Sequence, residues 1–193
     1  MNICVYGASS ELIDKCYIKS AEELGETLAK RGHNLVYGAG AQGVMGGVAR
    51  GTKKAGGNVV GVSPTFFNVD GVLFEDCDEL LYTDTMRERK AIMEERADAF
   101  VIAPGGIGTY EEFFEVFTLK QLARHNKAIV IFNQNGYYDK MIETMEDAEQ
   151  KGFIRHPTLE LYKVIDNIDE IFEYIEHYVP EEIDIVETRG VKE

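Results

Sequence analysis

Short apolar runs alternate along this chain with longer segments whose apolar residues recur every three or four positions. The runs are typical of strands buried in a parallel sheet, and the longer segments are typical of helices with one inward face. The expected strands are residues 2–6, 34–37, 58–62, 79–82, 99–103, 128–132 and 161–165. The expected helices are residues 19–31, 43–55, 86–93, 109–124, 138–151 and 168–178.

This alternation predicts an α/β fold, a Rossmann-like doubly wound parallel sheet with helices on both faces. The length of 193 residues suits a single domain. We expect residues 1–180 to form this domain and residues 181–193 to form a charged C-terminal tail. Residues 65–79 are polar and irregular and are expected to form a surface loop beside the site.

A glycine-rich turn follows the expected strand at residues 99–103, which is apolar throughout. Residues 104–112 read PGGIGTYEE, with three glycines in four positions before a helix. Glycines let several backbone N–H groups converge at a helix start, which favours anion binding. Thr109 and Glu112 also have the spacing of a helix capping box. The site interpretation is preferred because open α/β sheets bind ligands beyond the carboxyl ends of their strands.

Two other turns follow expected strands. Ser9 and Ser10 could cap the first helix or contact a phosphate or ribose. Residues 38–43 have the GxGxxG pattern of dinucleotide-binding oxidoreductases, but the next strand ends in Ser63 and Pro64 instead of the acid that holds a ribose. A dinucleotide site therefore loses its main support.

Cationic residues share one face of the helix that follows Thr85. Met86, Arg89, Lys90 and Met93 fall at the spacing of neighbours on that face. We expect Arg89 and Lys90 to face a cleft that binds an anion. The alternative is a solvated helix face with a Lys90–Glu94 ion pair.

Composition excludes several classes of function. The net charge of −14 argues against DNA or RNA as a partner. The three cysteines and four histidines lack the spacing of metal ligands, so neither a metal nor another cofactor is expected. The sequence shows no signal peptide and no membrane-length apolar run, and we expect a cytoplasmic protein without a membrane partner.

The segment PGGIGTYEE resembles the PGGxGTxxE signature of the LONELY GUY family, the cytokinin riboside 5′-monophosphate phosphoribohydrolases, often labelled lysine decarboxylase-like. Residues 86–90 (MRERK) resemble the second signature of that family, MxxRK. The segments ICVYGASS and NLVYGAGAQGVMGGVARG are also similar to family loops, so the resemblance covers most of the chain.

The resemblance implies hydrolysis of the N-glycosidic bond of a purine nucleoside 5′-monophosphate, such as AMP or a cytokinin riboside monophosphate, to the free base and ribose 5-phosphate. It implies Glu112 and Arg89 as catalytic residues. The residues expected to bind substrate are Met86, Lys90, Gly105, Gly106, Gly108, Thr109, Ser9, Ser10 and Gly43. It also implies a homodimer with the active sites near the interface. The nearly all-round apolar helix after Thr109 agrees with packing against another subunit, and a thick core would account for it as well.

Two alternatives belong to other classes. A noncatalytic carrier on the same scaffold would bind a nucleotide or cofactor without turnover. Lysine decarboxylation normally uses pyridoxal phosphate bound to a lysine, and no lysine here has the sequence context of such a site.

Overall fold

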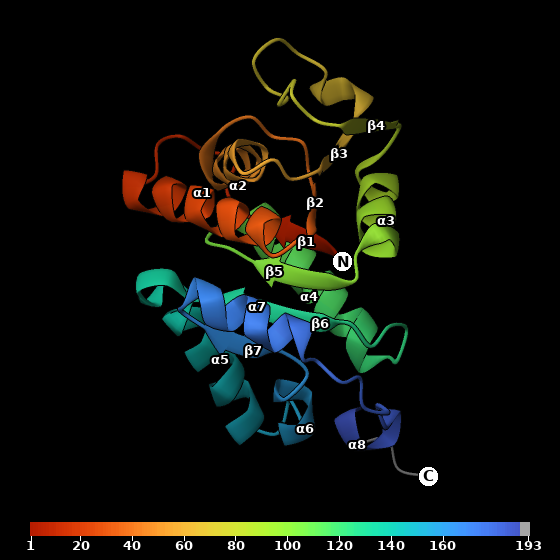
Figure 1. Ribbon diagram of the computed structural model, residues 1–193. Helices are drawn as coiled ribbons and strands as arrows, with labels where there is room; N and C mark the ends of the chain where they lie inside the picture. Colours follow the sequence, from red (N-terminus) through yellow and green to blue (C-terminus); the bar gives the residue numbers. More distant parts are fainter. Residues whose placement is uncertain (190–193) are drawn as a thin grey trace.

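Seven parallel strands form one sheet in the order β4-β3-β2-β1-β5-β6-β7, which Figure 1 shows from top to bottom. The structure is a computed structural model and describes residues 1–189. The strands are β1 (Asn2–Tyr6), β2 (Asn34–Tyr37), β3 (Val59–Pro64), β4 (Glu79–Thr83), β5 (Ala99–Ile102), β6 (Ala128–Phe132) and β7 (Lys163–Ile165). The predicted doubly wound α/β fold is confirmed, and each expected strand is present to within about two residues at either end.

Helices cover both faces of the sheet. One face carries α1 (Lys15–Lys30), α2 (Gly43–Lys54) and α7 (Ile168–Glu176), whose buried residues share a core with Ile3, Val5 and Val101. The opposite face carries α3 (Met86–Arg96), α4 (Ile107–Gln121), α5 (Asp139–Gln150) and α6 (His156–Leu159), around Cys4, Tyr6 and Ile102. Alternate residues of each strand therefore enter opposite cores, which explains why the central strands are apolar throughout.

The order of the strands reverses beside β1. The chain runs outward through β2, β3 and β4, and α3 then returns it to β5 on the other side of β1. The loops that follow β1 and β5 consequently leave the sheet in different directions and open a crevice between them. The Ala8 N–H donates to the carbonyl of Pro104 at 3.0 Å and links the two loops at this point.

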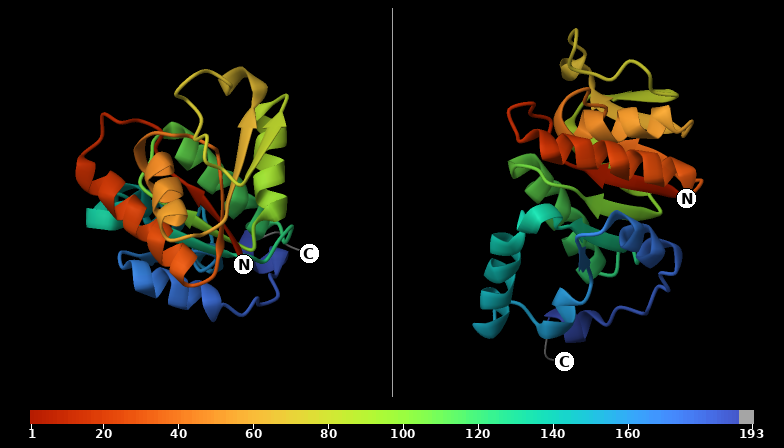
Figure 2. Two further views of the ribbon diagram at one scale, coloured as in Figure 1. Left: turned by 45° about the horizontal axis from the view of Figure 1, so that its top comes forward. Right: turned by 60° about the vertical axis from the view of Figure 1, so that its left-hand side comes forward.

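The segment between β3 and β4 arches away from the rest of the chain, in dark yellow in both views of Figure 2. It begins with a short 3-10 helix (Thr65–Phe67) and returns to the sheet past Gly40, which forms an isolated β-bridge with Leu73. The expected surface loop is thus held by backbone contacts to the loop that follows β2.

Helix α4 is buried mainly within its own chain. The rings of Phe113 and Phe117 are stacked, and both pack edge-on against Tyr162. Only Phe114 of the three phenylalanines is exposed. A thick core therefore accounts for most of the apolar character of this helix, and the homodimer stays a prediction.

Part of the expected tail is helical. Helix α8 (Ile185–Arg189) contacts α4 and α6, and Thr158 Oγ1 donates to the Thr188 carbonyl at 2.7 Å. Residues 190–193 lie outside the described residues. No helix in the described part of the chain is long and apolar enough to cross a membrane.

Candidate active site

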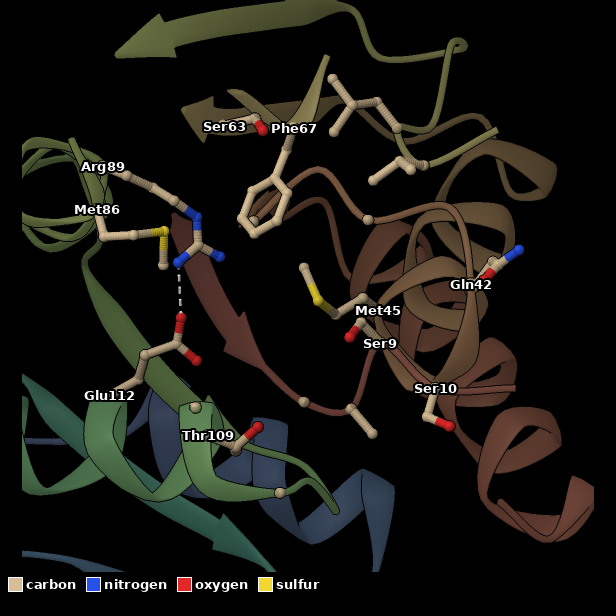
Figure 3. Close-up of a pocket in the computed structure, with 18 of the residues that line it drawn as sticks. Ser9, Ser10, Gln42, Met45, Ser63, Phe67, Met86, Arg89, Thr109 and Glu112 are labelled. Carbon is tan, nitrogen blue, oxygen red and sulfur yellow. Dashed lines mark hydrogen bonds and ion pairs between the residues drawn. The ribbon is translucent and has the colours of Figure 1, made fainter. Parts of the chain in front are cut away.

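A cavity of about 550 Å³ opens at the carboxyl ends of β1, β2, β3 and β5. Figure 3 shows the side chains that converge on it. The lining residues come from four loops, the end of β3, a 3-10 helix and three α-helices: Gly7, Ala8, Ser9, Ser10, Gly38, Gly40, Gln42, Met45, Ser63, Phe67, Val72, Leu73, Met86, Arg89, Gly106, Ile107, Gly108, Thr109 and Glu112. The site therefore lies where the strand order reverses, as the fold predicts.

A buried ion pair forms one wall of the cavity. Arg89 Nη1 of α3 donates to Glu112 Oε1 of α4 at 2.9 Å, and Arg89 Nε donates to the Val62 carbonyl at 3.1 Å. Only 7% of the Arg89 side chain and 10% of the Glu112 side chain are exposed. Arg89 thus spans from the end of β3 to α4 and fixes the orientation of the Glu112 carboxylate.

Gly38 allows the guanidinium to occupy this position. A Cβ atom on Gly38 would lie only 1.7 Å from Arg89 Nη2. The guanidinium is held from two directions by its hydrogen bonds, so it has little freedom to move aside. A glycine at the end of β2 is consequently a steric requirement of the ion pair.

The environment of Glu112 has two opposing effects on its acidity. Burial raises the pKa of the Glu112 carboxyl above its ordinary value, because the charged form loses its hydration. The charge and hydrogen bond of Arg89 counteract this rise. A carboxyl in this position can orient a water molecule in the cavity or accept a proton from it.

Helix α4 begins at the glycine turn without a side-chain cap. Its N-cap residue is Gly106, so Thr109 and Glu112 lie inside the helix and the capping-box interpretation of this pair is wrong. Helix α3 provides the contrast, since Thr85 and Glu88 form a full capping box there. The first turn of α4 therefore presents uncapped backbone N–H groups to the cavity, which is a favourable place for an anion.

The glycines of this turn have different steric settings. A Cβ on Gly105 would meet the Thr109 side chain at 2.1 Å, so Gly105 is needed for the chain itself to pack. A Cβ on Gly106 or Gly108 would meet no atom within 4 Å, and neither glycine has a positive φ. Packing within the chain does not require glycine at positions 106 and 108. A ligand that occupied the space beside them would require it, because a side chain there would fill that space.

Two tyrosines support the turn from behind. The Tyr137 hydroxyl donates to the Gly105 carbonyl at 2.7 Å, and the Tyr138 hydroxyl donates to the Ala103 carbonyl at 2.8 Å. Both residues follow β6 and precede α5. They fix the carbonyl groups of the turn and leave its N–H groups to the cavity.

The loop after β1 lies on the other side of the cavity. Ser9 and Ser10 both line the cavity, and the cap of α1 is Asp14, whose carboxylate accepts from the Cys16 N–H at 2.8 Å. The N-capping interpretation of the two serines is therefore wrong. Gly43 does not line the cavity. Its φ is 61°, and a Cβ there would lie 2.6 Å from the carbonyl oxygens of Ala8 and Ser10, so it seats this loop against α2.

The two cations of α3 face different surroundings. Arg89 and Met86 line the cavity, but Lys90 does not. Lys90 forms ion pairs with Glu111 and Glu115 of α4, instead of the Glu94 pair considered from the sequence. Lys90 therefore holds α3 and α4 together beside the Arg89–Glu112 pair.

Several cavity residues were not identified from the sequence. Ser63, Phe67, Val72 and Leu73 come from segments that carry no short signature, and Gln42 and Met45 lie in a glycine-rich segment whose pattern singles out only its glycines. The glycine loop after β2 was recognised, but the steric role of Gly38 depends on a contact with a distant helix. Among residues 1–189, no group of three or more His, Cys, Asp or Glu side chains is arranged to hold a metal ion.

Comparison with known sequences places the chain in a family. A family model described as "possible lysine decarboxylase" matches residues 45–175. The cytokinin riboside 5′-monophosphate phosphoribohydrolase LOG of Oryza sativa subsp. japonica is 38% identical over 93% of this chain and 74% of its own length. The enzyme of the same name from Mycobacterium tuberculosis is 37% identical over 86% of this chain and 88% of its own. The chain belongs to the LONELY GUY family.

Solved structures show that the fold of this LONELY GUY family member is shared more widely. The molybdenum cofactor carrier protein of Chlamydomonas reinhardtii aligns with a TM-score of 0.68 and 21% identity, over 91% of this chain and 95% of the carrier. At that identity the likeness concerns the fold alone. Function has to be argued from the site.

Proposed function

We propose that this protein hydrolyses the N-glycosidic bond of a purine nucleoside 5′-monophosphate to the free base and ribose 5-phosphate. The observation that carries the proposal is the buried Glu112 carboxylate, held by Arg89 at the wall of a cavity that also contains an uncapped helix start. The family membership and the names of the relatives support the same reaction.

Glu112 is the group that would act on the ribose. Cleavage of an N-glycosidic bond develops positive charge on the sugar ring, and an adjacent carboxylate stabilises that charge. The same carboxylate can orient the attacking water or take its proton. The bond between ribose and base breaks, the bond between ribose and the water oxygen forms, and the base departs with a proton.

Arg89 keeps this carboxylate ready for the reaction. Its guanidinium holds one Glu112 oxygen at 2.9 Å and partly offsets the rise that burial causes in the pKa of that carboxyl. Arg89 would thereby maintain the ionised form that the reaction needs and would stabilise the negative charge of the nucleotide. Lys90 supports the pair from outside the cavity through Glu111 and Glu115.

The start of α4 is the site we propose for the 5′-phosphate. The uncapped N–H groups there point toward the cavity, and Gly106 and Gly108 leave the adjacent space empty. Thr109, Ser9 and Ser10 add hydroxyl groups around that space. An anion bound at this helix start would place the ribose beside Glu112.

The deciding experiment is incubation of the purified protein with AMP, followed by chromatography of the products. Release of adenine together with an equal amount of ribose 5-phosphate is the expected result. Binding of AMP without release would instead support the alternative of a noncatalytic carrier, the function named for the fold relative from Chlamydomonas reinhardtii.

Lysine decarboxylation has less support from the site. Pyridoxal phosphate enzymes hold their cofactor as a Schiff base on a lysine. None of the described residues that line the cavity is a lysine, and the nearby Lys90 is engaged by two carboxylates.

We further propose that the protein acts as a homodimer in the cytoplasm, with the exposed Phe114 of α4 and Met86 of α3 near the subunit contact.

A further inference from the structure

The segment between β3 and β4 brings an aromatic side chain into the cavity. Phe67 ends the short 3-10 helix after β3 and lines the cavity. Farther along the segment, the Ala41 N–H donates to the Val72 carbonyl at 3.0 Å, and the Phe74 N–H donates to the Ala39 carbonyl at 2.9 Å. Phe67 is therefore carried by a segment that is fixed at both ends. It continues directly from β3, and near its other end it is hydrogen-bonded to the loop that follows β2.

The Phe67 ring is partly exposed and faces the cavity. It is 43% exposed, and Figure 3 shows it projecting into the cavity beside the Arg89 guanidinium and across from Met45. Its neighbour Phe66 is 57% exposed but does not line the cavity. Apolar surface left open to water is stabilised when a flat apolar group covers it, so the Phe67 ring is suited to a stacked ligand.

The two ends of the cavity differ in their side chains. Figure 3 shows Phe67, Met86 and the Ser63 hydroxyl in its upper part and Ser10 and Thr109 in its lower part, with the Arg89–Glu112 pair along the wall between them. A nucleotide has the same order of groups, with a flat base, then a ribose, then a phosphate. With the phosphate at the start of α4 and the ribose beside Glu112, the base reaches Phe67.

We propose that Phe67 binds the base of the nucleotide by stacking on its face, flanked by Met45 and Met86. This inference rests on the proposed function and assigns the base-binding part of the same site. A ring that stacks on a base does not read its hydrogen-bonding edge, so the subsite selects by area and favours a two-ring purine over a pyrimidine.

The test compares two ligands that differ by the base. The variants are Phe67→Leu, which removes the ring, Phe67→Tyr, which keeps it, and the control Phe153→Leu, which removes an exposed ring that does not line the cavity. The measurements are the KM for AMP and the inhibition constant for ribose 5-phosphate, which has no base. We expect Phe67→Leu to raise the KM for AMP at least about tenfold, the scale of one lost stacking contact. The inhibition constant should stay within about twofold, and the other two variants should resemble the wild type in both.

Two results from the variants would overturn the inference. An unchanged KM in Phe67→Leu would show that the base lies elsewhere. An equal loss for both ligands would show that Phe67 only holds the segment in place. Calorimetry with AMP and ribose 5-phosphate separates this inference from the proposed function. If the wild type binds AMP without releasing adenine, the hydrolase proposal fails, and the same variants still decide the role of Phe67 in binding. A wild type that binds neither compound overturns both.

Discussion

Arg89 Nη1 lies 2.9 Å from Glu112 Oε1, although the two residues are 23 positions apart and belong to different helices. Both side chains are almost fully buried, and together they form one wall of the cavity. Burying two charges costs free energy unless they are paired and hydrogen-bonded. This pair lies beside an open cavity and not inside a closed core. This setting is typical of groups that act on a ligand.

Glu112→Gln should separate catalysis from folding. Glutamine keeps the shape of the side chain but cannot stabilise a developing cation or accept a proton in the same way. We expect kcat for AMP to fall at least about a hundredfold while the circular dichroism spectrum is unchanged. The matched control is Glu143→Gln, because Glu143 is an exposed helical carboxylate that does not line the cavity. Near-normal turnover in Glu112→Gln would remove Glu112 from the reaction.

Gly38→Ala should reduce activity through Arg89. The added Cβ would lie 1.7 Å from Nη2, so the guanidinium has to leave its position against Glu112. We expect kcat/KM to fall about a hundredfold, the effect of displacing a catalytic group by about 1 Å. The same change in an Arg89→Met background should have little further effect, because the displaced guanidinium is already absent and the Met45 Cε, 2.7 Å from the new Cβ, is the end of a flexible side chain. Additive losses in the double variant would contradict this relationship.

The 5′-phosphate should be essential for efficient cleavage. Two or three charge-assisted contacts, at about 1.5–3 kcal/mol each, make adenosine a substrate on the order of a thousandfold poorer than AMP.

Gly108→Ala tests the same phosphate contact from the protein side. Its Cβ meets no atom of the chain, so thermal stability should be kept or slightly increased while the affinity for AMP and for free phosphate decreases. Equal rates on AMP and adenosine would mean that the glycine turn has no role in binding.

Glu94 should make the stability of the protein depend on pH. Burial, with the charge of Glu115 adding to it, raises the pKa of the half-buried Glu94 from 4.5 to about 7. Between these values the folded state keeps a proton that the unfolded chain has lost, so stability decreases as the pH rises from about 4.5 to about 7. Discounted for solvent exposure, the effect is on the order of 1 kcal/mol.

Glu94→Gln should remove this loss of stability. We expect its Tm to exceed that of the wild type by about 2–4 °C at pH 8 and to match it at pH 4, as thermal unfolding at the two pH values would show. A gain of the same size at pH 4 would indicate a packing effect and not a titration.

The assembly can be measured directly. The exposed apolar side chains of Phe114 and Met86, each 40% exposed, lie on the two helices that carry the ion pair. We expect light scattering to return at least twice the chain mass of 21.7 kDa. The paired substitution Phe114→Glu and Met86→Glu should favour the monomer by adding like charges to the contact. A fully active wild-type monomer would contradict the homodimer.

The sequence by itself determined the order of the elements and the fold. Strand and helix periodicity, and the turn residues between them, act over a few positions, so the sheet and the glycine turn before α4 were predictable. The two signatures also singled out Glu112 and Arg89 as candidates, and the structure brings those two residues together. Their catalytic roles stay predictions until the variants are measured.

Only the tertiary structure decided how these candidates are used. Helical spacing puts Arg89 and Lys90 on one face of α3, but the packing of α3 against β3 and α4 turns Arg89 into the cavity and Lys90 toward Glu111 and Glu115. The steric need for Gly38 and the position of Phe67 likewise depend on contacts between distant segments. Such contacts are fixed by the way whole helices and strands pack around the sheet. The two residues of each contact lie far apart in the sequence, so no local sequence pattern identifies them.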